Sequence, residues 1–301
     1  MWLILGILSS LFLGLYDLAK KHSLTGNAVL PVLLFSTLAS MLTVAPLLLI
    51  SMFKPEILEG SIFYIPPISI NEHLMIAMKS MIVASSWIFG YFAMKHLPIS
   101  IISPIRATGP FWMLIGAVLL LGERPNMPQL AGILTILVSF YYISIAGKLD
   151  GIHFRKDKWV MFTIAALLLG TCSGLLDKYL ISKLHYKPIT VQVWFTFYMV
   201  LLFLLIYVFL WMPTRHKTTP FKWRPTIALV GVFLILADFC YFTALGFEGS
   251  LLTILSALRR ASVLFVFWVG AVIFKERNIA KKAYALIGVL AGVMMILFSS
   301  R

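Results

Sequence analysis

Residues 103–112 read "SPIRATGPFW", and residues 256–265, in the other half of the chain, read "SALRRASVLF". One offset aligns polar residues of the two halves in the same order: Ser103 with Ser256, Arg106 with Arg259, and Glu123-Arg124 with Glu276-Arg277. An earlier pair of segments, "GLYDLAKKHSL" (14–24) and "GLLDKYLISKL" (174–184), aligns Asp17 with Asp177. The sequence therefore predicts a duplicated unit that carries an acid and an arginine in each copy.

The composition places this duplicated unit in a lipid bilayer. Of the 301 residues, 61% are hydrophobic and only 12% are charged, and a soluble domain of this size could not bury so much apolar surface. The formal net charge of +14 comes mainly from residues between apolar runs, which is typical of topology signals and not of a nucleic-acid-binding face. Cys172 and Cys240 lie inside apolar runs and show no pairing pattern.

Apolar runs of about 20 residues, the length needed to cross ~30 Å of hydrocarbon, recur along the chain. The first lacks the basic region and cleavage site of a signal peptide, so we expect it to be retained. We predict ten transmembrane helices, near residues 2–19, 29–53, 74–94, 98–121, 130–147, 159–182, 188–212, 225–246, 249–274 and 283–300.

These helices divide into two five-helix repeats, residues 1–147 and 158–301. Because five is odd, the second repeat enters the membrane upside down, and inverted repeats are typical of secondary transporters with a substrate site between the halves. The predicted fold is an all-α integral membrane protein whose inverted repeats surround a central cavity.

This plan resembles the drug/metabolite transporter superfamily, and within it the ten-helix EamA-like group. The five-helix repeats, the small-residue-rich helices and the "GER" (122–124) and "KER" (275–277) that close the fourth helix of each half carry the resemblance. It implies a carrier for small metabolites, often an exporter, in a bacterial inner membrane, and it leaves the substrate open.

Charged residues inside the predicted helices point to the substrate site. Arg106 and Arg259 lie about eight and ten residues into their helices, roughly 12 and 15 Å deep, where an arginine costs about 2.5–3.5 kcal/mol. Asp238 should lie at nearly the same depth as Arg259, because a very short turn joins their helices. A structural ion pair between them is one interpretation. An anionic substrate held by the arginines is the other, which we favour because the first half has no acid equivalent to Asp238.

Other side chains are expected to complete the site. Ser103 and Ser256 precede their arginines by three residues and so share a helix face with them. Tyr91, Tyr241 and Trp87 are aromatic candidates for the wall of the cavity. Asp17, Lys20 and Asp177 are expected as a gate or as pairs at helix ends, and Lys79 is expected to reach the interface by extending its side chain.

We predict no enzyme activity, metal or cofactor, since none of the six histidines lies in a ligand or catalytic pattern and no nucleotide-binding fingerprint is present. The predicted function is a secondary transporter, an exporter of a small polar, anionic or carboxylate-bearing metabolite. A flippase for a lipid-linked anion is the alternative with the same fold, and an intramembrane enzyme is the alternative of another class. The expected partners are the small-molecule substrate and the lipid bilayer, with no nucleic acid. The glycine spacings Gly170–Gly174 and Gly288–Gly292 allow a homodimer but suit packing within one chain better.

The lysines and arginines predict the orientation. Most lie in the loops after the odd-numbered helices, so the positive-inside rule places both termini outside. Single cysteines introduced within residues 55–70 should react with an impermeant maleimide applied from outside, whereas cysteines within 150–158 or 214–224 should be protected. The opposite labelling pattern would reverse the orientation.

Overall fold

The computed structural model describes residues 1–97, 102, 105–106, 109–122, 124–147, 157–260, 262, 287–288, 290–292, 294–295 and 298. These residues are helical or lie in connections, and no strand occurs among them. Ser103, Glu123, the Glu276-Arg277 pair, half of the predicted helix 249–274 and more than half of the predicted helix 283–300 lie outside the described residues.

The described helices follow the predicted apolar runs. They are α1 (Trp2–Leu24), α2 (Val29–Phe53), η1 (Pro55–Ile57), α3 (Ile70–His96), α5 (Gly109–Gly116), η2 (Ala117–Leu121), α6 (Met127–Gly147), α7 (Lys158–Lys178), η4 (Tyr179–Lys183), α8 (Pro188–Ile206), η5 (Tyr207–Trp211), α9 (Met212–Thr214), η6 (Arg215–Lys217), α10 (Pro225–Leu245) and α11 (Leu252–Arg260).

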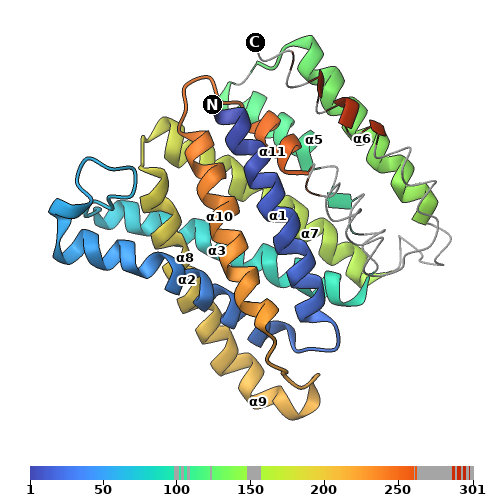
Figure 1. Cartoon of the computed structure of the whole chain (residues 1–301). Coiled ribbons are helices and arrows are strands. Elements are labelled where there is room, and N and C mark those ends of the chain that lie inside the picture. Colours follow the sequence, from blue (N-terminus) through green and yellow to red (C-terminus); the bar gives the residue numbers. More distant parts are fainter. Residues whose placement is uncertain are drawn as a thin grey trace.

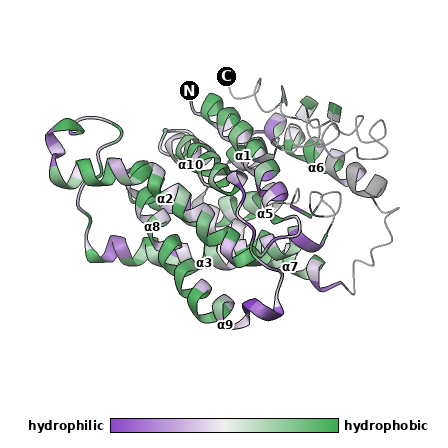
Figure 2. Ribbon diagram, turned by 60° about the horizontal axis from the view of Figure 1, so that its bottom comes forward, coloured by the Kyte–Doolittle hydropathy of each residue, from purple (hydrophilic) through white to green (hydrophobic). Residues whose placement is uncertain are grey.

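Six of these helices or continuous helical segments are long and apolar enough to cross a membrane: Trp2–Leu24, Val29–Phe53, Ile70–His96, Lys158–Lys183, Pro188–Lys217 and Pro225–Leu245. Figure 2 shows hydrophobic residues along the lengths of these helices and hydrophilic ones mainly near their ends. An α-helix suits this setting because it satisfies its backbone hydrogen bonds internally. The predicted total of ten spans stays a prediction.

Helices from the two halves of the chain are interleaved. In Figure 1, α1 and α10 lie side by side at the centre of the molecule. They are antiparallel, because Ser9 near the start of α1 donates to the carbonyl of Ala237, while Ser23 near its end hydrogen-bonds Thr226 at the start of α10. The helices α3 and α7 are likewise antiparallel neighbours. Each half is thus packed against the other along whole helices.

Local signals explain where several helices begin. Ser69 and Glu72 form a capping box, in which the Ser69 hydroxyl accepts from the Glu72 backbone and the Glu72 carboxylate accepts from the Ser69 backbone. Asp157 caps α7 by accepting from the Trp159 amide at 2.7 Å. Proline occupies the first turn of α8 and of α10, where a missing backbone N–H costs nothing.

The basic residues that the sequence analysis assigned to one side of the membrane gather at one end of the bundle. Lys21 donates to the carbonyl of Met94, Lys95 donates to Thr219, and Arg224 contacts the carbonyl of His22. The 24–29 and 217–225 connections meet there as well, since the Asn27 side chain pairs with the backbone N–H and C=O of Lys222 at 2.8 and 2.7 Å.

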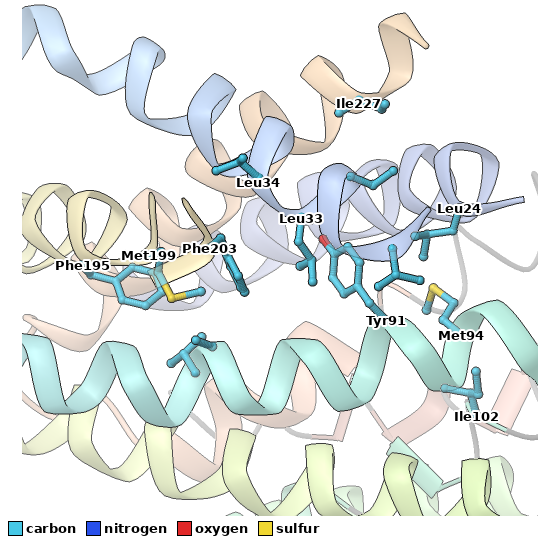
Figure 3. Close-up of a cluster of buried hydrophobic side chains, with 14 of the residues drawn as sticks. Leu24, Leu33, Leu34, Tyr91, Met94, Ile102, Phe195, Met199, Phe203 and Ile227 are labelled. Atoms are coloured by element: carbon cyan, nitrogen blue, oxygen red, sulfur yellow. The ribbon is translucent and has the colours of Figure 1, made fainter. Parts of the chain in front are cut away.

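Apolar packing fills the space between the helices. In Figure 3, the ring of Tyr91 on α3 lies near Leu33 of α2 and Met94, while Phe195, Met199 and Phe203 of α8 gather farther along the same cluster. Both glycine spacings are used within the chain: a side chain at Gly174 would contact Met113, and one at Gly292 would contact Ile136. A homodimer remains a prediction, and it would need another surface.

The closest approach between two helices lies at Gly231, where α10 crosses α2. A Cβ atom added there would meet the Ser36 carbonyl and would come within 2.7 Å of the Ser40 amide nitrogen, both of them backbone atoms. The Ser40 hydroxyl also donates to the Gly231 carbonyl at 3.0 Å. Only glycine permits this contact.

We expect Gly231→Ala to destabilise the protein by about 1–3 kcal/mol or more, because α2 and α10 must separate to admit the methyl group. The measurement is thermal unfolding of the purified protein in detergent. Gly90→Ala is the matched control, since its Cβ would make an ordinary contact of 3.6 Å with Ala166. Equal melting temperatures for the two variants would contradict the packing described here.

Candidate functional site

A cavity of about 240 Å³ lies between helices of the two halves. Side chains from α1, α3, α7, α8, α10 and α11 line it, together with residues of the 102–113 segment. The first helix of each half, α1 and α7, is among these elements.

The structure brings together most of the side chains that the sequence analysis assigned to the site. Those that line the cavity are Lys20, Trp87, Tyr91, Arg106, Asp177, Asp238, Tyr241, Ser256 and Arg259. Asp17 reaches the cavity through its contacts with Lys20 and Arg106. Ser103 lies outside the described residues. Ser256 and Arg259 both face the cavity, as their spacing on one helix predicts.

Arg259 makes the ion pair that its depth predicts. Its Nη2 donates to Oδ1 of Asp238 at 2.9 Å, and the guanidinium carbon lies 4.3 Å from the centre of the Tyr241 ring. Both charged side chains are largely buried. A carboxylate and an aromatic face together offset the cost of holding this arginine among apolar helices.

Asp17 is shared by two cations. Lys20, three residues along α1, lies 2.7 Å from Asp17 Oδ1, which confirms the predicted local pair. Arg106 approaches the same oxygen at 3.6 Å, a contact that the sequence analysis did not anticipate. The Lys20 ammonium also faces the rings of Tyr16 and Tyr91, at 4.2 and 5.2 Å. Arg106 is therefore the more weakly compensated of the two cations, and its side chain is 31% exposed.

The expectation that the Lys79 side chain reaches the membrane interface is wrong. The side chain does not extend to the interface: it is 1% exposed, and its Nζ lies 2.9 Å from Asp177 Oδ1. Asp177 is likewise buried, and Lys79 and Asp177 both line the cavity. The expected pair of Asp177 at a helix end is instead an ion pair inside the bundle.

The signal for this depth is present in the sequence. The Ser69–Glu72 capping box starts α3 at Ile70, four residues before the predicted start, so Lys79 lies about 13 Å along the helix. A π-helical segment, η4, continues α7 to Lys183, so Asp177 is more than one turn from the end. α1 likewise runs to Leu24, beyond its predicted end at residue 19, and this places Asp17 deeper than expected.

Aromatic side chains form much of the remaining wall. The hydroxyls of Tyr16 and Tyr91 hydrogen-bond at 3.1 Å, and Trp87 stacks on Tyr91 with ring centroids 6.4 Å apart. Trp87 also packs edge-on against Phe195. The cavity thus joins a charged surface to an aromatic one.

The charges at the cavity do not balance. Among the described side chains that line or contact it, the cations are Lys20, Lys79, Arg106 and Arg259, and the carboxylates are Asp17, Asp177 and Asp238. With every group ionised, the described part of the cavity carries a net charge of +1.

Comparisons with known proteins agree with the resemblance drawn from the sequence. Residues 1–145 match the family model of the EamA-like transporter family, which belongs to the drug/metabolite transporter superfamily. One solved crystal structure shares the fold with a TM-score of 0.72, at 15% sequence identity, covering 98% of both chains. No curated protein matches the sequence. With its apolar helices, the chain is a multi-pass membrane protein whose first 145 residues are similar to a family of transporters.

We expect Asp238→Asn to lower expression and to destabilise the protein by up to about 3 kcal/mol, because Arg259 keeps its charge but loses its carboxylate. Thermal unfolding of the purified variant measures this. The double variant Asp238→Asn/Arg259→Gln should recover much of the stability, since no unpaired charge remains. An Asp238→Asn protein as stable as the wild type would show that the Arg259–Asp238 ion pair does not stabilise the fold.

Proposed function

Since its first half matches the EamA-like transporter family, we propose that the protein is a secondary transporter that exports a small, carboxylate-bearing metabolite. It would act in a bacterial inner membrane, by alternating access of the cavity to the two sides. The family match supports transport, and the direction rests on the resemblance to EamA-like carriers drawn from the sequence.

The observation that carries the anionic substrate is the environment of Arg106. Its ion pair in the described structure is with Asp17 at 3.6 Å, and Lys20 holds the same carboxylate oxygen at 2.7 Å. A guanidinium can grip a carboxylate with two parallel hydrogen bonds, which this arrangement leaves unused. Arg106 also faces the cavity, so a substrate carboxylate can reach it.

Charge and size narrow the substrate further. With its acids ionised, the described part of the cavity carries a net charge of +1, which favours an anion over a neutral or cationic molecule. A volume of about 240 Å³ is smaller than the roughly 300–1,000 Å³ of drug-sized sites and suits a small metabolite. The aromatic wall at Trp87 and Tyr91 would take its apolar part.

Arg259 would contact the substrate after Arg106 does. It is held by Asp238 and Tyr241 in the structure, so it can contact the substrate only by exchanging a partner. Such an exchange would link substrate binding to a change in the contacts between α10 and α11. Links of this kind let a substrate favour one conformation of a carrier over another.

A set of three probes with one ring tests the charge preference: benzoate, the neutral benzamide and the cationic benzylamine. We expect benzoate to raise the melting temperature of the purified protein and the other two to leave it unchanged. Stabilisation by benzamide or benzylamine but not by benzoate would refute an anionic site.

Conservative variants test whether Arg106 and Arg259 bind the anion. Arg106→Lys keeps the charge but loses the two-pronged hydrogen bonding, so benzoate should bind about 100-fold more weakly, a loss of ~2.7 kcal/mol. Arg259→Lys should weaken binding as well. Arg215→Lys is the control, because Arg215 is exposed on η6 away from the cavity residues. Equal affinities for Arg106→Lys and Arg215→Lys would remove Arg106 from the site.

A further inference from the structure

The proposed anion site leaves one charged pair at the cavity without a role, Lys79 and Asp177. The two residues come from different halves of the chain, on α3 and α7, and their charged atoms are 2.9 Å apart. Their side chains are 1% and 8% exposed. Separating such a pair while both groups are charged would leave two uncompensated charges in a low-dielectric interior.

The Lys79 ammonium has a second set of contacts that does not depend on Asp177. Its Nζ lies 3.8 Å from the centre of the Phe195 ring and 4.7 Å from that of Phe242. Two aromatic faces stabilise a desolvated ammonium. Lys79 can therefore stay charged when the carboxylate beside it is neutral.

The surroundings of Asp177 favour the arrival of a proton. Asp177 lines the cavity, so water there can reach its carboxylate. Charged and titratable groups face it from three packed helices, Lys79 on α3, Asp238 and Tyr241 on α10, and Arg259 on α11, while α5 and α8 present Met113 and Phe195. Arg259 is already bonded to Asp238, so Lys79 is the main counter-charge of Asp177.

We propose that Asp177 is a proton-binding site coupled to anion binding in the cavity. Water delivers one proton to the Asp177 carboxylate, which becomes a neutral carboxyl group, and Lys79 remains an ammonium ion held by Phe195 and Phe242. The net charge of the described part of the cavity then rises by one, which strengthens anion binding at Arg106.

The same proton removes the ionic tie between α3 and α7, so that the two halves can move apart. By the reciprocity of linked binding, the anion in turn favours protonation of Asp177. Proton and anion therefore cross the membrane together, and the metabolite and proton gradients jointly set the direction. The coupling to an anion rests on the proposed function, whereas the proton site itself does not.

The proton site can be tested without any substrate. Infrared difference spectra of the protein in nanodiscs, recorded between alkaline and mildly acidic pH, should show the carbonyl stretch of a newly protonated carboxyl group. Asp177→Asn should lack this band, and Asp17→Asn and Asp238→Asn should retain it. Lys79→Gln should also lack the difference band, because Asp177 then loses its main counter-charge and stays protonated at both pH values, so that its carbonyl band appears in the absolute spectrum, where Asp177→Asn shows none. A band lost in Asp238→Asn or Asp17→Asn, but kept in Asp177→Asn, would assign the proton to another residue and overturn the proposal.

The coupling needs a transport experiment with a probe that never carries a proton itself. Benzenesulfonate stays ionised, so an imposed benzenesulfonate gradient across proteoliposomes should drive protons in the same direction, followed with an enclosed pH-sensitive dye. Asp177→Asn should abolish the proton movement.

The two experiments distinguish a failure of the proposed anion carrier from a failure of the proton site or of its coupling to the anion. Benzenesulfonate transport in wild-type vesicles without proton movement would overturn the coupling while leaving the anion carrier intact. An infrared band at Asp177 with no benzoate or benzenesulfonate binding would refute the proposed function while leaving the proton site intact.

Discussion

The structure depends on how charge is held among apolar helices. Lys20, Lys79 and Arg259 each have the same two kinds of partner, a carboxylate and the face of an aromatic ring. Each partner offsets part of the loss of hydration, and the two contact the charge from different sides. Arg106 departs from this pattern, because it shares a carboxylate with Lys20 at a longer distance. The described part of the cavity is thus a set of largely compensated cations around one, Arg106, that is incompletely compensated.

This compensation also explains the order of the helices in space. Lys79 on α3 pairs with Asp177 on α7, and the contact of Asp17 with Arg106 joins α1 to the segment that carries Arg106. A carboxylate from the first helix of each half meets a cation carried by another element. The pairing of Asp17 with Arg106 gives physical meaning to the repeat in the sequence, since residues that align between the halves, Asp17 with Asp177 and Arg106 with Arg259, all come to one cavity.

Apolar periodicity and length predicted the helices well, because α2 begins and ends where its apolar run does, and the Arg259–Asp238 pair followed from depth and a short turn. The depth of Asp17, Lys79 and Asp177 was predicted wrongly. A hydropathy pattern ends a helix at its first polar residues, whereas α1 and α3 extend through such residues; for Asp177 the predicted end was nearly right, and the buried partner Lys79 was missed. Only the capping box at Ser69 marked one of these true ends. The sequence could not predict that Lys79 pairs with Asp177, because the two residues lie on helices that no turn joins.

The crossing of α2 and α10 constrains how the two halves can move. At Gly231 the backbones touch with no room for a methyl group, and nearby the Asn27 side chain substitutes for a backbone partner of Lys222. Sliding or separating these segments would expose polar backbone groups that have no other partner there. A small rotation about the contact would preserve it. The glycine crossing therefore restricts relative movement of α2 and α10 to changes that keep their two backbones in contact.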